Sequence, residues 1–436
     1  MKVLKFGGTS VGSAVRMKDV AKLICDGNQK IVVLSAMSGT TNSLVEISDY
    51  FYKNNTSGAL EKINALEQKY YLTINELFST DKYKLECIAI IKSHFEYIRS
   101  FSKSVFTLFE EKAILAQGEL LSTNMFHLYL LESGVKSVLL PALEYMRIDK
   151  NAEPDTAYIV DNLSKQLEEY AGAEIYITQG YICRNFYGEI DNLQRGGSDY
   201  SASLIGAAIN AEEIQIWTDI DGMHNNDPRI VEGTKPVRML HFEEAAELAY
   251  FGAKILHPTC ILPAKLNNIP VRLLNTMEPE APGTLISNQI SQGLIEAVAA
   301  KDNITAIKIK SGRMLLAHGF LRKVFEIFES YRTSIDMVTT SEVGVSVTID
   351  NTKHLDEIVN DLKKFGTVTV DSDMVIICVV GDMPYENVGF QAKVVSALKD
   401  IPVRMISYGG SNYNISFLVK GEDKQKALQA LSKNLF

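Results

Sequence analysis

The chain has 436 residues, of which 46% are hydrophobic and 22% are charged, and its formal net charge is −9. This length exceeds what one hydrophobic core usually supports, so we expect at least two domains. The acidic balance argues against nucleic-acid partners, and no apolar stretch is long enough to cross a bilayer.

The N-terminal sequence begins directly with a strand-like run, and no apolar leader precedes that run. We therefore expect a cytoplasmic protein. The five cysteines show no metal-ligand spacing. Neither disulfides nor a protein-bound metal ion is expected from them.

Short apolar runs alternate with helical patterns as far as about residue 290, which predicts an α/β domain with a mostly parallel sheet sandwiched by helices. Several of these runs end in glycine or polar residues, and ligands of open α/β sheets sit beyond the carboxyl ends of the strands. Between about 54 and 131 the pattern changes to long amphipathic helices, which predicts a helical insertion. The expected strands lie near 3–4, 31–34, 175–177, 214–217 and 271–274.

A different order of elements begins near Gly293. A βαββα pattern of the ferredoxin-like type covers about 300–372 and recurs over 373–436. The first copy includes expected strands at 304–309 and 334–338, and the second includes an expected helix from Glu386 to Leu398. The second copy lacks a final strand, whereas a spare strand at 294–299 precedes the first copy. We infer that the spare strand completes the second copy and that the two domains interlock.

The strongest local signal is Lys5-Phe6-Gly7-Gly8-Thr9-Ser10, where an N-terminal strand should turn into a helix. Paired glycines let backbone amides approach phosphate oxygens, and a lysine can neutralise charge on a transferring phosphoryl group. A tight turn with an exposed lysine would explain a lone Gly-Gly equally well. Neither of the two common nucleotide-binding glycine motifs is present.

A second glycine loop, Arg195-Gly196-Gly197-Ser198-Asp199, precedes an alanine-rich helix. A helix cap accounts for Ser198 or Asp199 but not for Arg195. A guanidinium at this place can hold a carboxylate through two parallel hydrogen bonds.

A third cluster comprises Trp217-Thr218-Asp219, Asp227-Pro228-Arg229 and the segment from Phe251 to Pro258. Taken singly, these are a strand end, a proline turn and a helix end. Their presence together, after two loops that pair glycines with a cation, favours a nucleotide site.

Taken in chain order, these segments resemble the amino-acid kinase family and specifically its aspartate kinases. Two further segments share this resemblance, Ser35 to Asn42 and Gln117-Gly118-Glu119. The resemblance covers nearly the whole chain. It implies ATP and Mg²⁺ as cofactors and phosphorylation of the L-aspartate β-carboxylate to 4-phospho-L-aspartate, the first step toward lysine, threonine and methionine.

The resemblance also implies roles for single residues. Asp199 would orient Lys5, Glu119 would meet the substrate amino group, and Arg195 would meet a carboxylate. Many family members carry tyrosine where this chain has His224. The triphosphate would contact Lys5, Gly7, Gly8, Thr9 and Ser10; aspartate would contact Ser35, Thr41, Glu119, Arg195 and Ser198; the rest of ATP would contact Thr218, Asp219, His224, Arg229 and Lys254.

The C-terminal repeat resembles the paired ACT domains of lysine-inhibited, monofunctional aspartate kinases. Topology alone is equally compatible with a dimerisation module that binds no ligand. Ala317 and His318 differ from the Ser-Arg pair of that branch. We expect a homodimer or a dimer of dimers. On the resemblance, lysine would bind around Met314, Gly319, Phe320, Leu321, Ser334, Asp336, Thr340, Ser341 and Glu342.

Two alternatives stay open at this point. The chain could be a sibling kinase that acts on glutamate, acetylglutamate or a nucleotide monophosphate, or a regulator that binds amino acids without catalysis. The joint presence of Lys5, Glu119, Arg195, Asp199 and Lys254 favours a working enzyme.

Overall fold

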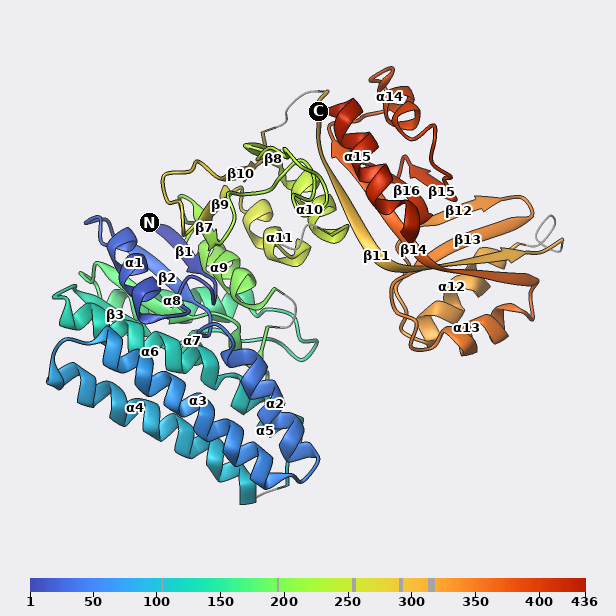
Figure 1. Cartoon of the computed structure of the whole chain (residues 1–436). Helices are drawn as coiled ribbons and strands as arrows, with labels where there is room; N and C mark the ends of the chain where they lie inside the picture. The colour runs from blue at the N-terminus through green and yellow to red at the C-terminus, as the bar shows by residue number, and fades with distance from the viewer. Residues whose placement is uncertain (104, 194–195, 253–255, 290–292, 313–317) are drawn as a thin grey trace. The chain divides into compact units, whose positions relative to one another are not determined.

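The computed structural model describes the chain except for residues 104, 194–195, 253–255, 290–292 and 313–317 (Figure 1). It forms two compact units, one made of 1–223 with 255–288 and the other of 224–254 with 289–436. Segment 224–254 therefore clusters with the C-terminal part of the chain. Among the described residues, no helix is long and apolar enough to span a membrane.

The first unit contains a sheet whose strands run in the order β3-β4-β2-β1-β7-β9-β10. Its pairs are parallel except for β9 with β10, which confirms the expected mostly parallel sheet. Every residue of β2 is buried, as a central strand covered on both faces requires. The strands are β1 (Lys2–Phe6), β2 (Lys30–Leu34), β3 (Ser137–Leu140), β4 (Ile175–Gln179), β7 (Ile214–Thr218), β9 (Val271–Asn275) and β10 (Thr284–Ser287).

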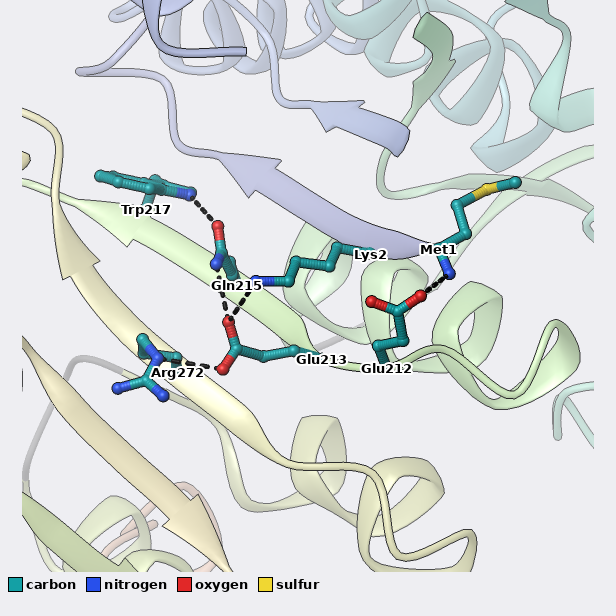
Figure 2. Close-up of polar contacts among 7 residues, drawn as sticks. All are labelled: Met1, Lys2, Glu212, Glu213, Gln215, Trp217 and Arg272. Carbon is teal, nitrogen blue, oxygen red and sulfur yellow. Dashed lines mark hydrogen bonds and ion pairs between the residues drawn. The ribbon is translucent and has the colours of Figure 1, made fainter. Parts of the chain in front are cut away.

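Polar side chains tie three of these strands together (Figure 2). Glu213, just before β7, accepts hydrogen bonds from Gln215 Nε2 at 2.7 Å and Arg272 Nε at 3.0 Å, and it lies 3.7 Å from Lys2 Nζ. Gln215 in turn accepts a hydrogen bond from Trp217 Nε1 at 3.1 Å. The side chains of β1, β7 and β9 thus share one network, which supports the register of these strands.

Helices cover this sheet and extend beyond it. The helical hairpin of α3 and α4 packs outside α6, and α6 packs against β3 and β4 (Figure 1). Although α6 falls within the expected insertion, it is therefore a sheet-covering helix. The elements are α1 (Ala14–Ile24), α2 (Thr40–Tyr52), α3 (Thr56–Leu77), α4 (Asp81–Ser100), η1 (Phe101–Lys103), α5 (Leu108–Leu115), α6 (Gln117–Glu132), α7 (Ala142–Tyr145), α8 (Thr156–Glu169), β5 (Ile182–Arg184), β6 (Ile190–Asn192), α9 (Gly197–Ala208) and α11 (Pro258–Leu266).

The second unit is built on a fully antiparallel sheet in the order β12-β13-β11-β14-β16-β15. The elements of the unit are β8 (Met239–His241), α10 (Phe242–Tyr250), β11 (Ile295–Lys310), α12 (Phe320–Ser330), β12 (Val338–Ser341), β13 (Gly344–Ile349), α13 (Leu355–Leu362), β14 (Thr367–Gly381), α14 (Phe390–Ala397), β15 (Met405–Tyr408), β16 (Asn414–Lys420), η3 (Gly421–Asp423) and α15 (Lys424–Leu435).

Two long strands join the ferredoxin-like copies. The first part of β11 pairs with 376–381 of β14, and its last part pairs with 367–371, with register shifts between Lys301 and Ala306. The sequence suggested separate strands at 294–299 and near 304–309, but the irregular register lets one strand serve both copies. The interlocked fold is therefore confirmed, with two separate cores around Phe417 and Phe328.

Candidate active site

The loops that follow β1, β2, β4 and β7 lie at one edge of the sheet. Phe6 is level with Leu34 and Trp217, and Leu34 is level with Gln179. The parallel register therefore brings the carboxyl ends of these strands together, where an open α/β sheet binds its ligands.

The glycine loop after β1 touches the loop after β2 through its backbone. Ser38 N donates to Gly8 O at 3.1 Å, and a Cβ on Gly8 would lie 2.9 Å from Ala36 O. Only glycine fits this close approach without displacing the neighbouring backbone. Ser10 is buried and bonds Thr276 Oγ1 at 2.7 Å, so its hydroxyl holds the loop in place.

Lys5 and Asp199 form an ion pair at this edge. Lys5 Nζ lies 2.6 Å from Asp199 Oδ1, and the two side chains are only 12% and 16% exposed. A Cβ on Gly7 would lie 3.7 Å from Lys5 Nζ. The sequence placed these residues almost two hundred positions apart, and the fold brings the ammonium, the carboxylate and the glycine loop into one site.

The loop before α9 is held tightly on both sides. Gly196 has a φ of +82°, and a Cβ there would overlap Cys260 Sγ at 2.2 Å. A Cβ on Gly180 would meet Ser198 at 2.5 Å, so the end of β4 lies directly against the start of α9. These two glycines allow the close approach that places Ser198 beside the strand ends. Arg195 lies outside the described residues.

Glu119 is a buried carboxylate near the loop after β2. It is 5% exposed, and its Oε1 accepts a hydrogen bond from Ala36 N at 3.2 Å. No cation among the described residues pairs with Glu119. Burial therefore raises the pKa of Glu119 to about 8, because desolvation disfavours the charged form. Ser122 Oγ donates to Ser35 O at 2.8 Å, which ties α6 to the same loop, and Thr41 is exposed in the first turn of α2.

The residues expected around ATP fall in both units. In the first, Thr218 Oγ1 donates to Asp219 Oδ1 at 3.1 Å. In the second, His224 Nδ1 lies 3.0 Å from Thr234 Oγ1, and Arg229 donates to both carboxylate oxygens of Asp227. That pairing lowers the pKa of Asp227. Lys254 lies outside the described residues.

The candidate effector residues lie in the second unit. Asp336 has a side chain only 1% exposed, and its Oδ1 is 2.7 Å from Lys301 Nζ and 2.9 Å from Tyr250 OH. Its Oδ2 is buried without a partner among the described residues. Phe320 is buried at the start of α12, and Met314 lies outside the described residues. Gly319 has a φ of +84°, and the exposed candidates are Leu321, Ser334, Thr340, Ser341 and Glu342.

Sequence reasoning missed the contacts that the α3–α4 hairpin makes with this site. Lys69 donates a hydrogen bond to Ser38 O, and Tyr70 OH lies 3.0 Å from Thr40 Oγ1. His94 Nδ1 lies 2.7 Å from Gln117 Oε1. An amphipathic pattern shows that a helix has a buried face but not which loop that face meets.

Comparison with known proteins agrees with this architecture. Residues 1–275 match the model of the amino acid kinase family, and residues 377–435 match an ACT domain. A lysine-sensitive aspartokinase 3 of Escherichia coli is 33% identical over all of this chain and 99% of its own length. The solved structure of E. coli aspartokinase III with aspartate and ADP (R-state) has a TM-score of 0.86 at 33% identity, covering 100% of both chains. The same enzyme with lysine and aspartate (T-state) has a TM-score of 0.81 at 32% identity, covering 100% of this chain and 99% of the other.

The fold and the matched family models define a class of kinases in which an α/β unit is followed by ACT domains. Within that class, the chain belongs to the amino acid kinase family, in its aspartokinase branch.

Proposed function

We propose that this protein transfers the γ-phosphoryl group of ATP to the β-carboxylate of L-aspartate, giving 4-phospho-L-aspartate and ADP. The observation that carries this proposal is the partly buried Lys5–Asp199 ion pair at the glycine loop. The full-length likeness to an aspartokinase solved with aspartate and ADP supports the same reaction.

The attacking group requires no general base, because a carboxylate is already deprotonated at neutral pH. Catalysis then depends on positioning two anions and offsetting their repulsion. Lys5 would neutralise charge on the transferring group, and Asp199 would hold its ammonium in place. The amides of Gly7 and Gly8 would cradle phosphate oxygens, with Thr9 and Ser10 completing the loop.

The amino-acid subsite would lie between the loop after β2 and the loop before α9. Glu119 would take the substrate ammonium, because a buried carboxylate without a cation gains most from one. We propose that Arg195 takes a carboxylate and that Ser35, Thr41 and Ser198 complete the subsite.

The nucleotide would be held by Thr218 and Asp219 at the end of β7, with His224, Arg229 and Lys254 as further proposed contacts. We propose Mg²⁺ as the metal of the reaction, since this ion favours nucleotide phosphates and water over an all-protein cage. When bound, Mg²⁺ would screen the phosphate charge.

We further propose that lysine inhibits the enzyme by binding beside α12 and β12. The free Oδ2 of Asp336 would accept the effector's amino group, and the start of α12 at Gly319 would face its carboxylate. Met314, Phe320, Leu321, Ser334, Thr340, Ser341 and Glu342 would complete this sensor site. A cytoplasmic homodimer or dimer of dimers is the proposed assembly.

One assay tests both activities. Purified protein is mixed with Mg-ATP and L-aspartate, the acyl phosphate is trapped with hydroxylamine, and the reaction is repeated with L-lysine, L-threonine or L-glutamate. Aspartyl hydroxamate whose formation lysine alone suppresses is the expected result. Binding of ATP without hydroxamate would favour the non-catalytic regulator, and product from glutamate, acetylglutamate or a nucleotide monophosphate would favour a sibling kinase.

A further inference from the structure

The helical hairpin of α3 and α4 lies against the loop after β2, which the proposed reaction uses to bind aspartate. The contact is made by the face of α3 that carries Lys69, Tyr70 and Thr73. Thr73 Oγ1 lies 3.9 Å from Met37 Sδ, and Tyr70 is fully buried against Thr40. Residues from one stretch of α3 thus contact three points along Met37 to Thr40.

Lys69 makes the polar contact nearest the turn of this loop. Its Nζ donates to Ser38 O, and a Cβ on Gly39 would lie 3.5 Å from that nitrogen. Gly39 has a φ of +78° and caps the start of α2. Because it is a glycine, it has no side chain that could fix the turn at this position. The ammonium of Lys69, on the neighbouring helix α3, fixes the turn instead.

The hydrogen bond is formed in a partly desolvated place. Burial lowers the pKa of Lys69, and no carboxylate in the described ion pairs accepts its charge. A charged donor that is partly removed from water makes a stronger hydrogen bond to a carbonyl than an exposed one does.

The position of Ser38 gives this bond its significance for the reaction. Ser38 N donates to Gly8 O, while its carbonyl accepts from Lys69. The backbone of one residue, Ser38, therefore connects the glycine loop with α3 through its two adjacent peptide groups, and the proposed aspartate contacts Ser35 and Thr41 flank it. A displacement of this turn would move the amino-acid subsite that it flanks. The glycine loop keeps a separate anchor in the Ser10–Thr276 hydrogen bond, and β7, with its proposed ATP contacts, stays in place.

We propose that Lys69 is a positioning residue of the aspartate subsite, through its hydrogen bond to the Ser38 carbonyl. The inference rests on the proposed function, since it concerns the binding of the acceptor substrate. In this proposal the α3–α4 hairpin, and not only the loops at the strand ends, shapes the aspartate subsite.

The test compares Lys69→Met with Lys62→Met in the full-length enzyme. Lys62 lies on the same helix and pairs with Glu46 of α2, so its replacement removes the same charge without touching the loop. Lys69→Met should raise KM for aspartate about tenfold, since a hydrogen bond to a charged group is worth at least that factor. KM for ATP and kcat should stay close to wild type, and Tm should fall by no more than a few degrees. Lys69→Arg should restore most of the affinity, and Lys62→Met should change neither KM.

Calorimetric titration of L-aspartate separates this inference from the proposed reaction. If wild type binds aspartate without turnover, the reaction is wrong, and the ratio of dissociation constants still tests Lys69. An unchanged aspartate affinity in Lys69→Met, an equal rise of both KM values, or no aspartate binding by wild type would each overturn the positioning role. Should Lys69→Met fail to fold, Lys69→Gln, which also removes the ammonium but keeps a polar end at this half-buried position, provides the same comparison.

Discussion

The first unit, which carries the proposed catalytic site, and the second unit, which carries the proposed sensor site, each bury a carboxylate. The two units differ in the groups that balance its negative charge. Glu119 accepts one backbone hydrogen bond and has no cation partner among the described residues. Asp336 is paired with Lys301, which also lies 3.0 Å from Asp350, and it accepts a hydrogen bond from Tyr250.

This difference indicates how each unit would treat an amino acid. A buried carboxylate without a cation, such as Glu119, is protonated in the free protein. It must release this proton when a ligand ammonium binds, so substrate binding and proton release are coupled. A carboxylate that already has an internal cation is balanced before any ligand binds, and an effector ammonium adds to an existing pair. Aspartate binding at the substrate site is therefore expected to depend on pH.

The largest expected effect is the loss of turnover on replacing Lys5. Lys5→Met should lower kcat by a factor of about 10² to 10³, because one preorganised charge contributes about 3 kcal/mol to transition-state stabilisation. The measurement is the hydroxamate rate at saturating substrates, with thermal unfolding to show that the fold is kept. Lys22→Met, on an exposed lysine of α1, is the matched control. A kcat near wild type would contradict the assigned role of Lys5.

Removing the internal cation of the sensor would make the two units alike. Lys301→Met leaves Asp336 buried without its ammonium, which should cost about 3 kcal/mol of unfolding free energy. Added L-lysine should recover part of that loss, because its ammonium replaces the missing charge. Denaturant unfolding with and without lysine measures both effects. Lys364→Met, which breaks an exposed pair with Asp361, should change little, and an unaltered Lys301→Met would refute the compensation.

The raised pKa of Glu119 predicts a pH-dependent affinity for aspartate. In the free protein the carboxyl is protonated below about 8, whereas the substrate ammonium needs the carboxylate. The dissociation constant for aspartate should therefore fall by up to tenfold per pH unit as pH rises toward 8, and then level off. Titration calorimetry from pH 6 to 9 measures this.

The raised pKa of Glu119 also makes the stability of the protein depend on pH. Because the folded pKa of Glu119 lies above its unfolded value of about 4.3, the contribution of this group to stability is present at low pH and is lost as pH rises to about 8. Glu119→Gln should remove both dependences. A flat affinity profile in wild type would show that Glu119 is ionised before aspartate binds.

The smallest effect is expected at the link between α10 and the sensor. Tyr250→Phe removes one hydrogen bond to Asp336 and should cost about 1 kcal/mol of unfolding free energy. Burial beside that carboxylate raises the pKa of Tyr250 to about 12, so the hydroxyl remains a donor across the physiological range. The lysine inhibition curve of the variant should shift while kcat stays unchanged. A loss of kcat equal to that of Lys5→Met would contradict a purely regulatory location.

Sequence patterns predicted most of the fold. The positions of β1, β2, β4, β7 and β9 and the order of the C-terminal repeat followed from period and turn residues, as did the spare strand beside the second copy, whereas β3 was missed. Other expectations failed locally. A strand was expected over 334–338, but β12 begins only at Val338; a helix was expected from Glu386, but α14 begins at Phe390, after Gly389 with a φ of +94°.

The candidate site was predicted by residue type, and its geometry came only from the fold. The sequence by itself determined the glycine loops, the alternation of strands and helices, and the presence of Lys5, Glu119 and Asp199, because local conformation and chemistry are carried by neighbouring residues. Tertiary structure decided that Lys5 pairs with Asp199, that Asp336 already has Lys301, and that Lys69 reaches Ser38. Burial and charge pairing depend on side chains that are distant along the chain and meet only after the sheet and helices have packed.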